Sequence, residues 1–170
     1  MLNEPSGQVE VARRIAAPAV TIFQIIADSG CHPDFDGSGM LRRGSPPMNI
    51  SRVGDEFMMS MHLAGLGDYQ MCNRVVEYSP NRRIAWEPTP GDQVAIDNAK
   101  VPFGESQGYR WSFDLSSVSP GITMVTERFD CSAAADGIRI AVENGRSWLE
   151  TMELSLALLA TLCAATVGSN

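Results

Sequence analysis

The chain has 170 residues, of which 44% are hydrophobic and 19% charged, a composition that fits one globular domain. Its formal net charge is −7 and its basic residues form only short, separated pairs, so we expect no nucleic-acid partner. No basic region followed by an apolar run opens the chain, and the apolar stretch 154–167 is shorter than the roughly 20 residues of a membrane span. We therefore expect a single cytoplasmic domain over 1–170, with its core at about 8–165 and no membrane span.

The first half of the chain predicts a strand, one or two short helices and then several strands. Residues 8–15 alternate as in a strand, and Pro18 suits the first turn of a helix that continues to Ala27. One further helical turn is expected over 31–35. The following segments are typical of strands: 40–43, 55–63, 68–78 and 82–87.

A long loop is expected over 88–106, because prolines, glycines and polar residues dominate that segment. It is longer than a direct turn between strands, so it is a candidate for a lid over a cavity or for a contact with a partner. Two further strands are predicted at 107–115 and 122–130, separated by the turn at Pro120 and Gly121.

The last third predicts a long helix with two adjacent apolar stripes. The first stripe is Leu149, Met152, Leu156, Leu159 and Cys163, and the second is Leu154, Leu158, Leu162 and Ala165. So wide an apolar arc indicates burial on more than one side. Such a helix fits the concave face of one strongly curved sheet. The element order therefore predicts an α+β helix-grip fold, with a curved antiparallel sheet of about six to seven strands around the C-terminal helix.

Several segments resemble a known superfamily at the level of residues. They are 16–19 (AAPA), 26–28 (IAD), 32–39 (HPDFDGSG), 53–59 (VGDEFMM), 71–78 (MCNRVVEY), 81–86 (NRRIAW), 109–111 (YRW) and 125–130 (VTERFD). Together they span nearly the whole chain, and the chain resembles the SRPBCC or START-like superfamily, in particular mostly actinobacterial members of its polyketide cyclase/dehydrase family. The resemblance implies a helix-grip fold and a cavity for lipids, sterols, polyketides or hormones. It does not imply one chemistry, because only some members are enzymes.

The predicted cavity wall is rich in methionine and aromatic residues. Methionine adapts to flexible apolar ligands, and aromatic rings suit planar ones, although ordinary core packing explains each residue equally well. Asn73 and Tyr109, like Tyr69, are polar candidates for orienting a ligand. The candidate cavity residues are Met59, Met61, Met71, Asn73, Trp86, Tyr109, Trp111, Val125, Phe129, Met152 and Leu156.

Glu127 is the candidate catalytic residue. If Val125 and Phe129 face inward, strand alternation places Glu127 inward as well. A carboxyl group in an apolar cavity has a raised pKa and can act as an acid or a base on a ligand. Two alternatives remain: a neighbouring arginine pairs with Glu127, or the strand faces the other way, with Met124, Thr126 and Arg128 inside.

A metal site is the weaker interpretation of His32, Asp34 and Asp36. Imidazole and carboxylates are suitable ligands, but acidic residues before glycines also form turns and caps. We therefore predict capping and a place at the cavity mouth for these residues, with no metal and no cofactor.

The favoured function is binding of a small hydrophobic molecule, lipid-like or polyketide-like, between the sheet and the C-terminal helix. The first alternative is a cyclase or dehydratase that uses Glu127. The second is a homodimeric interaction module, for which the apolar arc of the helix would supply the interface. Converging polar groups and a perturbed carboxylate would favour the enzyme, whereas a dry cavity would favour the binder.

Overall fold

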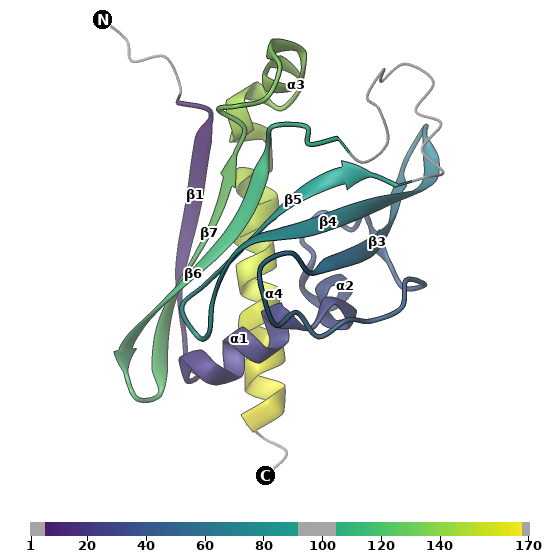
Figure 1. The fold of residues 1–170 in the computed structure, drawn as a ribbon. Coiled ribbons are helices and arrows are strands. Elements are labelled where there is room, and N and C mark those ends of the chain that lie inside the picture. Colours follow the sequence, from purple (N-terminus) through teal and green to yellow (C-terminus); the bar gives the residue numbers. More distant parts are fainter. Residues whose placement is uncertain (1–5, 92–104, 168–170) are drawn as a thin grey trace, which may run out of the picture.

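The computed structural model describes residues 6–91 and 105–167, and its centre is one seven-stranded antiparallel sheet. The order across the sheet is β1-β7-β6-β5-β4-β3-β2, so the first strand pairs with the last (Figure 1). The strands are β1 (Gln8–Ile15), β2 (Leu41–Arg42), β3 (Glu56–Leu63), β4 (Gly67–Ser79), β5 (Arg83–Pro90), β6 (Arg110–Ser119) and β7 (Ile122–Asp130). The predicted helix-grip class is confirmed.

The helices lie at the two ends of the sheet and across its curved inner side (Figure 1). After β1 come α1 (Ala19–Ala27), the 3-10 helix η1 (Ser29–Cys31) and α2 (His32–Phe35), which confirms the predicted short helices. Pro18 is the N-cap residue of α1. After β7 come α3 (Asp136–Ala141), the 3-10 helix η2 (Glu143–Trp148) and α4 (Leu149–Val167). Neither α3 nor η2 was predicted from the sequence.

Only one apolar stripe of α4 is fully buried. Met152, Leu156, Leu159 and Cys163 pack inside, where α4 lies against β1 and α2. The sequence predicted that α4 is buried on more than one side. The second stripe is not fully buried, because Leu154 is 50% exposed and Leu158 is only partly buried. The sheet curls around the helix without enclosing it, so the second stripe meets the rim of the core.

The segment Glu143–Thr166 is long and apolar enough to cross a membrane, with a mean hydropathy of 1.4 over its best window. The sequence analysis considered only the apolar stretch 154–167. The segment that passes this test is longer, because it begins at Glu143, before the start of α4. A core helix passes the same test of length and composition, and α4 has its fully buried stripe against the sheet.

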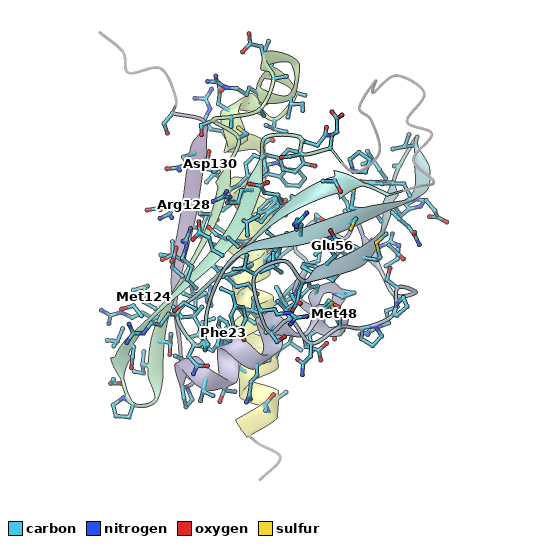
Figure 2. The ribbon with its side chains drawn as sticks, viewed as in Figure 1. Phe23, Met48, Glu56, Met124, Arg128 and Asp130 are labelled. Atoms are coloured by element: carbon cyan, nitrogen blue, oxygen red, sulfur yellow. The ribbon has the colours of Figure 1, made fainter. Side chains whose placement is uncertain are left out.

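The two faces of the sheet differ in chemistry, as β7 illustrates. Val125, Glu127 and Phe129 are buried on the inner face. Between them, Arg128 points outward and pairs with Glu10 at 2.8 Å (Figure 2). Of the two registers considered for this strand, the structure has the one that places Glu127 inside.

The segment after β5 departs from the predicted loop of 88–106 at both ends. β5 continues through Pro90, and β6 begins at Arg110 and not at 107. Proline is tolerated here because β5 pairs with β4 on one side, whereas its pairing with β6 ends at Trp86. The centre of the expected loop, 92–104, lies outside the described residues, and so does any role of it as a lid.

Candidate functional site

A cavity of about 380 Å³ lies between the inner face of the sheet and the helices. Its wall is mostly apolar and comes from β2 to β7, the loops before β2 and β6, the helices α2, α3 and η2, and the first turns of α4. The residues that line it are His32, Phe35, Asp36, Ser38, Met40, Leu41, Met59, Met61, Tyr69, Met71, Asn73, Trp86, Pro88, Pro90, Gln107, Tyr109, Trp111, Phe113, Glu127, Phe129, Ile138, Val142, Trp148, Thr151 and Ser155.

Most of the residues singled out in the sequence lie on this wall. Those on it are Met59, Met61, Met71, Asn73, Trp86, Tyr109, Trp111, Glu127 and Phe129. The other three, Val125, Met152 and Leu156, are fully buried in the core and do not line the cavity. Val125 lies two residues before Glu127 on the same face of β7, so facing inward and reaching the cavity are different properties.

Two groups of aromatic rings contribute to the wall. In the first, the His32 ring stacks on Trp86 with centroids 5.4 Å apart, and the edges of Phe35 and Phe57 meet it. In the second, Trp111 contacts Phe129 at 4.7 Å and Trp148 at 5.4 Å. Except for Phe57, these rings line the cavity and offer aromatic faces and edges to an apolar ligand.

Glu127 is a buried carboxyl group without a partner. Its side chain is 6% exposed, and it makes no hydrogen bond or ion pair with the described residues. Burial raises the pKa of Glu127 from 4.5 to about 8, and the nearby charge of Asp36 adds to the increase. No arginine pairs with it, so the group is largely protonated at neutral pH and can donate a hydrogen bond.

His32 is deeper in the protein than the predicted place at the cavity mouth. It is 3% exposed, and its Nε2 lies 2.7 Å from the carbonyl oxygen of Ile26. A carbonyl only accepts, so Nε2 carries the proton and Nδ1 is left as an acceptor without a partner. Burial lowers the pKa of His32, with smaller opposing effects from the Ile26 carbonyl and from Asp28 and Asp36.

We expect His32 to be neutral at pH 6.5, with its proton on Nε2. At this pH a histidine in water is half protonated, whereas the pKa of His32 is lowered by burial. Long-range ¹⁵N–¹H correlation spectra distinguish the two ring nitrogens directly. A protonated Nδ1 at pH 6.5 would contradict the expected state.

Trp148, at the end of η2, is a cavity residue that the sequence analysis missed. Its indole Nε1 is buried and has no hydrogen-bond partner. The structure thus has three buried side-chain atoms without partners among the described residues, on His32, Glu127 and Trp148, and all three residues line this cavity. A tryptophan immediately before the apolar stripe of the helix was the available signal, but the turn that directs it inward was not predicted.

The three residues considered for a metal site have separate partners. Asp36 accepts hydrogen bonds from the backbone N–H groups of Ser38 and Leu41, and Asp34 pairs with Arg43. His32 donates to Ile26 as described. Within residues 6–91 and 105–167, no group of three or more His, Cys, Asp or Glu side chains is arranged to hold a metal ion.

Fold and cavity together define the class: an α+β helix-grip protein with a partly open, mostly apolar cavity. No family model matches the chain. It is 33% identical over 144 residues to the uncharacterized protein Rv0088 of Mycobacterium tuberculosis, an alignment that covers 85% of this chain and 54% of that protein. The chain therefore spans about half the length of the curated relatives it matches.

Solved structures share the fold at low sequence identity. Protein NE0264 from Nitrosomonas europaea has a TM-score of 0.67 at 14% identity, over 97% of this chain and 99% of that one. The Aha1 dimer from Colwellia psychrerythraea has a TM-score of 0.53 at 17% identity, over 89% of this chain and 95% of that one. Likeness at this level shows the fold alone.

Proposed function

We propose that this protein binds a small, mostly apolar ligand in the cavity between its sheet and α4. The observation that carries the proposal is that the three residues with unpaired buried side-chain atoms in the described part of the chain, His32, Glu127 and Trp148, all line this cavity. Buried polar groups are nearly always paired, because an unpaired one costs about 1–3 kcal/mol. Three such groups around one apolar cavity are explained if a ligand supplies their partners.

Acid–base catalysis on the bound ligand is the second candidate function. Glu127 supports it, because a buried carboxyl with its pKa raised to about 8 can give and take a proton near neutral pH. The cavity is neither the dry cavity expected of a binder nor the cavity with several converging polar groups expected of an enzyme. Its wall is apolar like that of a binder, and its single perturbed carboxyl group is of the kind that an enzyme uses. Binding is common to both functions and is therefore the primary proposal.

Native mass spectrometry of the purified protein, followed by organic extraction, tests the proposal. We expect a co-purified apolar molecule, and we expect its occupancy to fall roughly tenfold in Met71→Trp, where the indole fills part of the cavity. Met124→Trp is the matched control, because Met124 lies on the outer side of β7 (Figure 2). Equal occupancy in both variants would contradict binding in this cavity.

The same experiment separates the two functions. A ligand that returns with unchanged mass after prolonged incubation indicates binding alone. Loss of water or of another small group from the ligand, abolished in Glu127→Gln, indicates catalysis.

Three further predictions remain part of this proposal. Membership of the SRPBCC superfamily is supported by the fold and by the residues quoted above. A cytoplasmic location fits its unpaired cysteines, Cys31, Cys72, Cys131 and Cys163.

A homodimer is supported by the half-exposed Leu154 on α4, and a neighbour in fold is described as a dimer. Light scattering tests the dimer.

A further inference from the structure

We infer that the cavity selects uncharged ligands bearing both a hydrogen-bond donor and an acceptor, and rejects carboxylates of the same size. This inference rests on the proposed function and gives the chemical class of the ligand. It follows from which charges line the cavity and from which hydrogen-bonding groups are unpaired there.

The first step concerns charge. The titratable residues on the described wall are His32 from α2, Asp36 from the following loop, Tyr69 from β4, Tyr109 before β6, and Glu127 from β7. None of these is an arginine or a lysine. On both sides of Glu127, its strand partners are apolar, with Val11 on β1 and Phe113 on β6. A ligand carboxylate would therefore lose part of its water without gaining a cation from the described wall, and it would lie in a cavity that already holds two acidic side chains.

The second step concerns hydrogen bonding. The Trp148 indole only donates, and the free Nδ1 of His32 only accepts. Glu127 donates when protonated and accepts when ionised. An ammonium group would leave the indole unpaired, since it has no acceptor. A hydroxyl group both donates and accepts, so it matches either kind of partner, and a carbonyl adds a further acceptor.

A set of naphthalene derivatives of nearly equal size tests the inference by isothermal titration calorimetry. The probes are 2-naphthylmethanol, 2-naphthoate, 2-naphthylmethylammonium and naphthalene itself. We expect the alcohol to bind roughly tenfold more tightly than naphthalene and at least about tenfold more tightly than the carboxylate at pH 7. The margin over the carboxylate should widen from about pH 6 to about pH 9, because Glu127 ionises in that range and then repels the anion.

Two variants identify the groups responsible. Glu127→Gln cannot ionise, so the margin of alcohol over carboxylate should no longer change with pH. Trp148→Phe keeps an aromatic ring and removes the N–H, so affinity for the alcohol should fall several-fold while affinity for naphthalene stays the same. Glu56→Gln, an outward carboxylate on β3 (Figure 2), is the control and should bind all probes like the unmodified protein.

The outcomes separate this inference from the proposed function. Equal affinity for the alcohol and the carboxylate would overturn the selectivity and leave ligand binding standing. Tightest binding of the ammonium would also overturn it, because Glu127 would then act as a counter-charge. If none of the probes bound, including naphthalene, the proposed function would fall and the inference with it.

Discussion

Glu127→Gln is expected to stabilise the protein at alkaline pH, by on the order of 4 kcal/mol at pH 8. The reason is the burial of this carboxyl group without a partner in the part of the chain that the structure describes. In the unfolded chain it ionises with a pKa near 4.5, whereas in the folded protein its pKa is about 8. Glutamine fills nearly the same space and has no proton to lose.

The sign follows from the number of protons that each state holds. Below about pH 4.5 the carboxyl is protonated in both states and costs nothing through ionisation. Between about pH 4.5 and about pH 8 the folded protein keeps the proton and the unfolded chain releases it, so stability falls as pH rises. Above about pH 8 both states are ionised, and the free energy of unfolding lost through Glu127 stays constant at about 5 kcal/mol at most.

Guanidinium unfolding of both proteins between about pH 4 and about pH 9 measures this effect as a difference curve. His32 also makes stability depend on pH, because its lowered pKa costs stability as pH falls below about 6.5. This contribution is the same in both proteins and cancels when their free energies of unfolding are subtracted. We expect the two proteins to differ little near pH 4 and to diverge steadily above it. Parallel curves across the range would show that Glu127 is solvated or paired in the folded protein.

Gly37→Ala is expected to lower the free energy of unfolding by about 3 kcal/mol, through a clash with the backbone of α4. A Cβ at this position would overlap the carbonyl oxygen of Thr151 and would lie 2.8 Å from the amide nitrogen of Ser155. The Gly37 N–H also donates to the Ser155 hydroxyl at 2.8 Å. Backbone atoms cannot turn aside as the end of a flexible side chain can, so the loop or the helix must shift.

The same change should disturb the cavity, because Asp36 and Ser38 on either side of Gly37 line it. Gly121→Ala is the matched control: an added Cβ there meets nothing within 4 Å. That variant should stay within about 0.5 kcal/mol of the unmodified protein by guanidinium unfolding. Equal stability of the two variants would contradict the tight contact between this loop and α4.

Local sequence patterns were sufficient for most of the elements. The alternation in β7 and the apolar stripe of Met152, Leu156 and Leu159 depend only on neighbours along the chain. The order of these elements then predicted the helix-grip fold, because a long apolar helix after a run of antiparallel strands needs a concave sheet to cover it. The short α3 and η2 were not predicted, since in η2 the turn depends on left-handed backbone angles at Glu143, Asn144 and Gly145. The Asn144-Gly145 pair is a recognised turn signal that the interpretation of this segment did not use, whereas glutamate seldom adopts such angles.

The sequence by itself determined the fold class, the alternation of the main strands and the candidacy of Glu127, and it left open which face of each strand turns inward. Only the tertiary structure decided that Glu127 has no partner among residues 6–91 and 105–167 and that His32 and Trp148 line the same cavity. It also left Val125, Met152 and Leu156 in the core behind the cavity wall. The physical reason is that periodicity shows which residues share a face, whereas the choice of the inward face, pairing and cavity depth depend on residues far apart in the chain.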